Sequence, residues 1–391
     1  MKNSKRSLEL SLINMEKIKL TAGCFILSLI LPVLTGCGPS AKDLEAVDYT
    51  PIVRSDWETA TPEEVRLDAI ELDTLYYNAS KLKTLYSLLV VKDGKLVGEG
   101  YFNAGSIDEI DKRASVTKSY TSAMLGIALD KGYISNIDEK MLDYFPDIRD
   151  RVTDPRKFDI TIRNMLEMRA GYPSEEHDAT AWDIMWSGDY LGAIASLPLS
   201  ADPGTRFQYS NLTAHYIGII VARATGTDKL TFGNEYLFGP LDVHAGEGWL
   251  RDVDGYYIGG GDIMFTARDM AKFGLLYLNK GEYNSRQLIS SEWVEVSLRT
   301  YTVNEFEVTN VGHFKNMGYG YQWWSADVGE HKVNFAWGHG GQLIVLVHDL
   351  NMVIVTAADS FWGKDIHFDS WSHESAIMKM VSDYIYRLPV E

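Results

Sequence analysis

Residues 113–129 read RASVTKSYTSAMLGIAL and predict a turn of small residues that leads into an amphipathic helix. Ser115 and Lys118 stand three residues apart, and on a helix that spacing places two side chains on one face within contact distance. A helix N-terminus carries unpaired N–H groups and positive partial charge, so an oxyanion formed at Ser115 would meet donors already in place. A lysine in a partly apolar pocket loses proton affinity, which lets it accept the serine proton.

The Ser-x-x-Lys pattern alone is weak, because the chain contains it a second time at Ser80 and Lys83. Ser80 precedes a strand-like run at residues 85–91, which favours a surface serine there. A solvated helix face is the competing interpretation of the Ser115 pair. Other motifs must therefore decide between the two.

The charge of the chain excludes one class of partner. Lys and Arg number 37 against 54 Asp and Glu, which gives a formal net charge of -17 without a basic run in the body of the chain. This argues against nucleic acid as a partner. It also disfavours strongly anionic substrates, unless a local cationic site outweighs the net charge.

Residues 1–36 are predicted to be a signal peptide. A basic start precedes an apolar run at residues 20–33, and Leu34-Thr35-Gly36-Cys37 follows. The last four residues resemble the bacterial lipobox, which implies cleavage before Cys37 and lipidation of its thiol. We therefore expect an extracytoplasmic, lipid-anchored protein on the periplasmic face, attached to the outer membrane if the source is Gram-negative. An uncleaved membrane helix is disfavoured because the apolar run is short and contains Pro32.

The mature chain is expected to hold neither a disulfide nor a cysteine-based zinc site. The sequence has two cysteines, and Cys24 leaves with the signal peptide while Cys37 carries the lipid. Since the leader is long, Met15 competes with Met1 as the true start. Residues 37–60 show little periodicity and are predicted to be a tether, followed by a single domain at 61–391.

The rest of the chain predicts one antiparallel sheet interrupted by helices. Asp93-Gly94, between the runs 87–91 and 95–101, is a strong hairpin signal. Further strand patterns come late, at residues 317–324, 333–337, 342–347 and 352–357. Helical patterns occur at residues 61–79, 161–170, 212–224, 266–279, from 290 onward, and at 372–386. Early and late strands can share a sheet only if the middle, at about 130–260, is largely helical. The fold class is therefore α/β (α+β), with a cleft between sheet and helices.

Two further motifs lie near predicted element ends. Tyr209-Ser210-Asn211 comes just before an apolar helix, and Trp337-Gly338-His339-Gly340-Gly341-Gln342 heads an apolar strand. Glycines at a strand end let another group approach the backbone closely. Each motif has a chance rival, Tyr76-Tyr77-Asn78 within a predicted helix and His244-Ala245-Gly246 without a following strand.

Together the motifs resemble the pattern of serine β-lactamases and penicillin-binding proteins, in the Tyr-x-Asn variety of class C enzymes and their esterase and DD-peptidase relatives. Order, spacing and local context agree for Ser115-x-x-Lys118, Tyr209-x-Asn211 and His339-Gly340-Gly341. The similarity includes Gly259-Gly260-Gly261 and residues 266–270, and it extends from about residue 60 to the C-terminus.

The resemblance implies a role for each matching residue. Ser115 would be the nucleophile, Lys118 would take or relay its proton, and Tyr209 would share that proton network. Asn211 would bind the substrate, together with the strand-head residues His339, Gly340, Gly341 and Gln342. The backbone N–H groups of Ser115 and Gln342 would form the oxyanion hole. No metal or organic cofactor is expected.

The third motif departs from the Lys-Thr-Gly of efficient β-lactamases, where cation and hydroxyl hold a carboxylate. Here His339 and Gly340 stand instead, and a neutral imidazole is the poorer anchor. We therefore favour a general hydrolase of a small ester, amide or peptide, including amidases of the 6-aminohexanoate-dimer hydrolase type. Trp182, Trp186, Trp323 and Trp337 are more typical of core packing than of a pocket, and the acidic, aromatic segment 172–186 suits a cleft wall or a surface loop equally.

Three alternatives stay open or are weighed against this interpretation. A peptidoglycan DD-peptidase or weak β-lactamase is the nearest. A non-catalytic cell-wall binding or sensor module is the alternative of another class, and the presence of every expected catalytic side chain argues against it. A metallohydrolase is disfavoured because the nine histidines are scattered and no His-Glu-x-x-His occurs. The oligomeric state does not follow from the sequence.

Overall fold

A computed structural model describes residues 39–359 and 370–390. The predicted signal peptide and Cys37 lie outside these residues. Within the described ranges, no helix is both long and apolar enough to cross a membrane.

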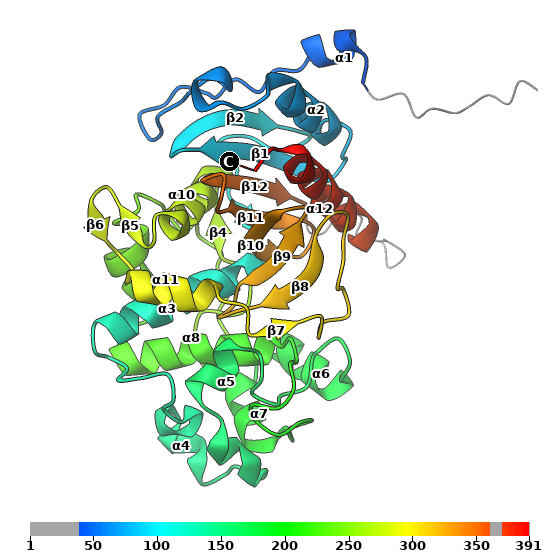
Figure 1. Cartoon of the computed structure of the whole chain (residues 1–391). Helices are drawn as coiled ribbons and strands as arrows, with labels where there is room; N and C mark the ends of the chain where they lie inside the picture. The colour runs from blue at the N-terminus through cyan, green and yellow to red at the C-terminus, as the bar shows by residue number, and fades with distance from the viewer. Residues whose placement is uncertain (1–38, 360–369, 391) are drawn as a thin grey trace, which may run out of the picture. The chain divides into compact units, whose positions relative to one another are not determined.

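The central element is an eight-stranded antiparallel sheet in the order β2-β1-β12-β11-β10-β9-β8-β7 (Figure 1). Its strands are β1 (Leu85–Lys92), β2 (Lys95–Tyr101), β7 (Thr302–Val303), β8 (Lys315–Tyr319), β9 (Trp324–Val328), β10 (His331–Gly338), β11 (Gln342–Val347) and β12 (Met352–Ala358). The early hairpin joins the late strands where β1 pairs with β12, with Leu88 opposite Thr356. Asp93 and Gly94 turn the hairpin with positive φ angles of 53° and 79°. The predicted sheet, built from both ends of the chain, is confirmed.

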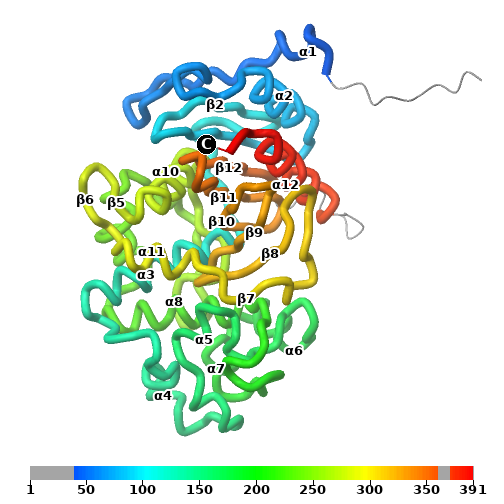
Figure 2. Tube along the Cα trace, in the orientation of Figure 1, coloured from blue at the N-terminus to red at the C-terminus, as the bar shows by residue number. Residues whose placement is uncertain are grey.

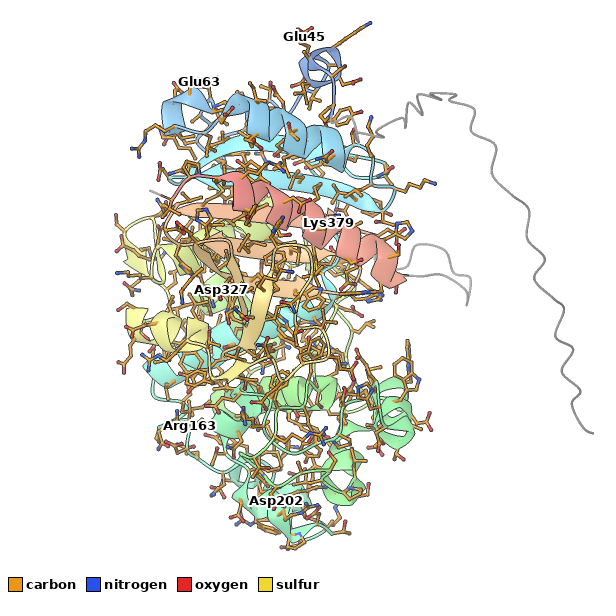
Figure 3. The ribbon with its side chains drawn as sticks, turned by 45° about the vertical axis from the view of Figure 1, so that its right-hand side comes forward. Glu45, Glu63, Arg163, Asp202, Asp327 and Lys379 are labelled. Atoms are coloured by element: carbon orange, nitrogen blue, oxygen red, sulfur yellow. The ribbon has the colours of Figure 1, made fainter. Side chains whose placement is uncertain are left out.

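The chain between β2 and β7 is mostly helical and holds two small two-stranded sheets, β3 (Asp111–Lys112) with β4 (Met264–Phe265) and β5 (Glu282–Tyr283) with β6 (Arg286–Gln287). Helices also cover the main sheet. They are α2 (Ala69–Ala79), α3 (Thr117–Asp130), α4 (Pro146–Arg149), α5 (Ile162–Leu166), α6 (Ala179–Ser187), α7 (Tyr190–Ser196), α8 (Asn211–Thr225), α9 (Lys229–Gly233), α10 (Ala267–Leu278), α11 (Ser291–Leu298) and α12 (Ser370–Arg387), after a short α1 (Ala41–Glu45). Figures 2 and 3 show the region of α4 to α8 on one side of the sheet, with Arg163 and Asp202 in it.

The two faces of the sheet contribute to two separate cores. Along β1, Leu89 and Val91 pack with α3, α8 and α10, whereas Leu88 and Val90 pack with α2 and α12. This follows from the strand period of two, which sends successive side chains to opposite faces. Since both faces are covered, the inner strands are apolar without alternation.

Three predicted elements differ in the structure. The expected strand 317–324 is the end of β8 and the start of β9, because Gln322 adopts a φ of 64° and its side chain donates to carbonyls near the end of α5. The expected helix 61–79 is interrupted at Arg66, whose φ is 59°. The segment 172–186, which shows no periodicity, contains α6, capped by the side chain of Asp178.

Part of the segment predicted to be a tether lies against the sheet. Tyr49 stacks on Tyr76 with ring centroids 4.7 Å apart, and the Trp57 indole donates to the carbonyl of Gly94. The N–H of Leu96 donates to the backbone carbonyl of Glu58 and that of Glu99 to the carbonyl of Tyr49, so residues 49–60 follow β2. Aromatic side chains thus give this acidic segment an apolar anchor.

Gly274 generates a stability prediction, since α10 crosses the sheet at this glycine. A Cβ at this position would lie 2.6 Å from Val353 Cγ1 and 2.8 Å from Ile344 Cγ2. We expect Gly274→Ala to lower the free energy of unfolding by about 1–2 kcal/mol, although alanine favours a helix over glycine by ~1 kcal/mol. Urea denaturation measures the loss. The double variant with Val353→Ala should be more stable than the sum of the single losses predicts, and an additive cycle would contradict the steric explanation.

Candidate active site

Ser115 lies in a single 3-10 turn, Ala114–Val116, directly before α3. Ala114 holds a φ of 43°, and its carbonyl accepts from the hydroxyl of Thr117 and the N–H of Asp262. The end of β10 closes on the same turn, because a Cβ at Gly338 would lie 3.2 Å from the Ser115 nitrogen. These hydrogen bonds and the close approach of β10 therefore fix the turn that carries the serine.

Lys118 is 1% exposed and donates three hydrogen bonds to three separate segments. Its Nζ lies 2.9 Å from Ser115 Oγ, 2.6 Å from Asn211 Oδ1 and 2.6 Å from the carbonyl of Gly260. Burial lowers the pKa of Lys118 from 10.5 to about 7, against the opposing charge of Glu175. At this pKa a substantial fraction of the amine is neutral at pH 7, and the neutral amine can keep its two N–H groups on Asn211 and Gly260 while its lone pair accepts the Ser115 proton.

Asn211 is placed by a buried carboxylate at the start of α8. Glu175 Oε1 accepts from the Ser210 hydroxyl at 3.0 Å and from the N–H of Leu212 at 2.8 Å, while Oε2 accepts from the N–H of Asn211 at 2.9 Å. The carboxylate thus binds free N–H groups of a helix N-terminus, where a negative charge is favourable. Burial raises the pKa of Glu175.

Tyr209 lies beside the lysine. Lys118 Nζ is 4.8 Å from the centroid of its ring, and the ring packs against Tyr319 and Trp324 on the sheet. Burial raises the pKa of Tyr209, and a hydrogen bond with the Ser115 side chain opposes that rise. The structure therefore brings Tyr209 to Ser115 and Lys118, and its part in the proton network stays a prediction.

The glycine segment 259–261 forms the wall that receives Lys118. Gly259 donates its N–H to Nδ1 of His215, so His215 Nε2 carries the proton and donates to Asp252 at 2.9 Å. The Thr121 hydroxyl donates to the carbonyl of Gly259. Because these neighbours fix the backbone, the Gly260 carbonyl is held toward the amine.

The third motif makes the turn between β10 and β11. Gly340 and Gly341 have φ angles of 82° and 95°, and Gly340 donates its N–H to the buried Glu374 of α12 at 2.6 Å. The same carboxylate accepts from the Trp337 indole and lies 3.4 Å from Nδ1 of His339, which is 54% exposed. Burial raises the pKa of Glu374, whereas His339 lowers it.

Gln342 is brought to the site only through its main chain. Its side chain is buried, accepts from the N–H of Ala358 and from Arg113 Nη1, and donates to the Ala358 carbonyl. Opposite it, Gly338 pairs with Gln342 across the strand ends, next to the Ser115 turn. The oxyanion-hole role of its N–H stays a prediction.

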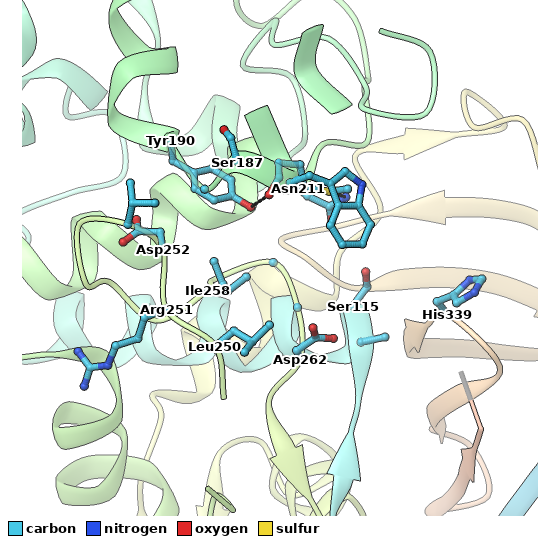
Figure 4. A pocket seen from close by; sticks show the side chains of 17 residues that line it. Ser115, Ser187, Tyr190, Asn211, Leu250, Arg251, Asp252, Ile258, Asp262 and His339 are labelled. Carbon is cyan, nitrogen blue, oxygen red and sulfur yellow. Dashed lines mark hydrogen bonds between the residues drawn. The ribbon is translucent and has the colours of Figure 1, made fainter. Parts of the chain in front are cut away.

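A cavity of about 510 Å³ opens beside the serine (Figure 4). Ser115, Asn211, Gly260 and His339 line it. Residues of α6 and of the segment 250–253 also line it, among them Trp186 and Leu250. The expectation of core packing is therefore wrong for Trp186 and for Trp182, which are both exposed, but it holds for the buried Trp323 and Trp337.

Sequence reasoning missed the two buried carboxylates that hold the site. The sequence places Glu175 only within an acidic, aromatic segment, and Glu374 only within the last predicted helix. Both lie more than thirty residues from the backbone they bind. Their signal is a lone acid in an apolar context, which becomes informative only when the partner N–H groups are known.

Comparison with known proteins now defines the family. The profile of the family described as Beta-lactamase matches residues 86–364, which is most of the chain. The chain belongs to the β-lactamase family. This is a family of serine hydrolases.

The relatives within the family carry varied names. A 6-aminohexanoate-dimer hydrolase of Paenarthrobacter ureafaciens is 28% identical over 287 residues, which is 68% of this chain and 71% of that protein. Among solved structures, a putative β-lactamase from Bacteroides dorei has a TM-score of 0.65 at 18% identity, covering 81% of this chain and 98% of its own. A putative 6-aminohexanoate-dimer hydrolase from Bacillus anthracis has a TM-score of 0.61 at 21% identity, covering 78% and 81%. The two structures support the fold alone, and the predicted fold is confirmed.

The carboxylate of Glu175 generates a second prediction. In Glu175→Gln, an amide N–H₂ replaces one acceptor oxygen and meets N–H or O–H donors, so we expect a loss of about 1–3 kcal/mol in the free energy of unfolding. Glu176→Gln is the matched control, since Glu176 is exposed, and should change stability by less than ~0.5 kcal/mol. Urea denaturation of both variants measures the difference. Equal stability of the two variants would show that the carboxylate does not hold the helix start.

Proposed function

We propose that this protein is an exported serine hydrolase that cleaves an ester or amide bond through an acyl-enzyme on Ser115. The observation that carries the proposal is the buried Lys118 amine, 2.9 Å from Ser115 Oγ and with a pKa lowered to about 7. The family supports a hydrolase, and the named relative supports amide or ester chemistry.

Acylation uses the contacts that the site already contains. Ser115 Oγ bonds to the substrate carbonyl carbon while its proton passes to Lys118 Nζ, and the carbonyl oxygen becomes an oxyanion facing the N–H groups of Ser115 and Gln342. The oxyanion then collapses, the bond to the leaving group breaks, and that group takes a proton from Lys118 or Tyr209. Each N–H group that donates to the oxyanion lowers the activation free energy by about 3–4 kcal/mol.

Deacylation reverses the roles of the same groups. Water bonds to the acyl carbon and loses a proton to the network of Tyr209 and Lys118. Ser115 Oγ leaves and regains its proton, so the acid product is released and the site is restored. Asn211, held by Glu175, stays in place to bind the substrate.

A DD-peptidase or weak β-lactamase is the second candidate in the same class. What favours it is that Ser115, Asn211 and His339, one residue from each motif, line the same cavity. We also propose that Cys37 carries a lipid and holds the mature domain on the periplasmic face of a bacterial membrane. The basis for this anchor is the lipobox-like sequence.

The nucleophile is tested by intact-mass analysis of the purified protein after exposure to a fluorophosphonate and, separately, to a penicillin. We expect one fluorophosphonate adduct on the wild type and on Ser80→Ala, the other Ser-x-x-Lys serine, and none on Ser115→Ala. A lasting penicilloyl adduct would instead favour the DD-peptidase or sensor. If neither reagent modifies the wild type, the proposal fails and a binding module remains.

The base is tested by the pH dependence of that labelling. Only the neutral amine accepts a proton, and the pKa of Lys118 is about 7, so the rate should rise about tenfold per pH unit below 7 and level off above it. Lys118→Ala should label at least a hundredfold more slowly, whereas Lys83→Ala should behave as the wild type. A rate that is flat from pH 5.5 to 8.5 would exclude Lys118 as the base.

A further inference from the structure

We propose that the preferred substrate carries a bulky, uncharged apolar group next to the scissile bond, and that Trp186, Leu250 and Val253 bind it. This inference rests on the proposed function and names its substrate class. The three side chains are called the apolar rim below. None of the rim residues belongs to the three motifs that carry the chemistry.

The apolar rim is exposed, although its residue types favour burial. Trp186 is 70% exposed, Leu250 49% and Val253 68%, and all three line the cavity beside Ser115. Single exposed apolar side chains are ordinary, but a group of them at the mouth of a cavity indicates a ligand site. Met185 and Ile258 continue this apolar wall inside the cavity.

Local contacts keep the rim in place without a ligand. A Cβ at Gly188 would lie 3.3 Å from Val253 Cγ1, so the end of α6 touches the segment that carries Leu250 and Val253. The Val253 N–H donates to the Gly188 carbonyl. Buried Asp252, bonded to His215, fixes that segment on α8. A preformed apolar surface costs little conformational entropy when a substrate binds.

The charges around the cavity oppose a substrate carboxylate. Asp262 lines the cavity, and its negative charge, with those of Glu175 and Glu176, acts on Lys118. The cations nearby are engaged: Lys112 with Asp262 at 3.6 Å, and Arg251 with the Gly255 carbonyl and the ring of Tyr257. A carboxylate placed here would be repelled without a compensating ion pair.

A chain-length series of 4-nitrophenyl esters, from acetate to octanoate, tests the rim. For the wild type, kcat/KM should rise about two- to fourfold per methylene until the rim is covered, because each buried methylene contributes about 0.8 kcal/mol. Trp186→Ala and Val253→Ser should each flatten this rise and lower kcat/KM for the octanoate by roughly tenfold, with acetate changed by less than about twofold.

Matched controls separate the rim from general surface effects. Ile70→Ala removes an exposed isoleucine of α2, outside the cavity lining, and Val303→Ser removes an exposed valine of β7. Both should keep the wild-type slope to within about twofold. A slope that is flat in the wild type, or that is unchanged in both rim variants, overturns the proposal.

The charge preference is tested with a pair of esters of equal length, 4-nitrophenyl hexanoate and the mono-4-nitrophenyl ester of adipic acid. The second carries a terminal carboxylate, and its kcat/KM should be at least about tenfold lower at low salt. Asp262→Asn should narrow that gap, as should added salt. Equal rates for the two esters in the wild type would overturn the inference.

These outcomes are separate from failure of the proposed function. If fluorophosphonate labels Ser115 but the esters show neither chain-length nor charge preference, the hydrolase stands and the substrate class is wrong. If Ser115 is not labelled, the hydrolase itself fails. Preference for the carboxylate ester would point to the DD-peptidase alternative.

Discussion

The hydrogen bonds of one buried amine tie the active site together. Lys118 Nζ donates to Ser115, Asn211 and Gly260, which lie on the turn before α3, at the start of α8 and in the glycine segment. A lysine loses its hydration when it is buried, and the desolvation free energy is offset only if hydrogen-bond acceptors are held in fixed positions around the amine. Each acceptor is fixed by a neighbouring hydrogen bond. The turn of Ser115 is closed by the Thr117 hydroxyl, Asn211 is bound by Glu175, and the segment of Gly260 is bound by His215.

This arrangement sets catalysis against stability. Because burial lowers the pKa of Lys118 from 10.5 to about 7, the unfolded chain binds more protons than the folded one between these values. The contribution of Lys118 to stability therefore rises with pH across that window and is least favourable below about pH 7. The same desolvation that costs folding energy yields an amine able to take the serine proton near neutral pH. Burial of the two apolar cores on either side of the sheet stabilises the fold and offsets the free-energy cost of burying Lys118.

Local patterns in the sequence predict much of this, because several decisive features are local. The Asp93-Gly94 turn and the apolar late strands each specify their own element, as does Thr266, whose side chain accepts from the N–H of Asp269 at the start of α10. The sheet follows from the order of these elements. The three motifs also lie at the ends of helices and strands, where a short local sequence determines the direction of the chain. The boundaries set by distant contacts were missed. Gln322 ends a strand because it binds carbonyls near α5, and α6 has no apolar period since Trp182 and Trp186 are exposed.

The carboxylates at the site show why sequence alone could not complete it. Glu374 lies on the last helix, yet it fixes Gly340 and faces His339. When His339 is protonated, its positive charge is already paired with this buried acid. The half-exposed imidazole therefore does not substitute for the lysine of Lys-Thr-Gly as a free anchor for a carboxylate. Two features thus disfavour an anionic substrate: histidine stands where Lys-Thr-Gly has lysine, and that histidine faces Glu374. That second contribution depends on a contact across 35 residues, which no pattern near the motif reveals.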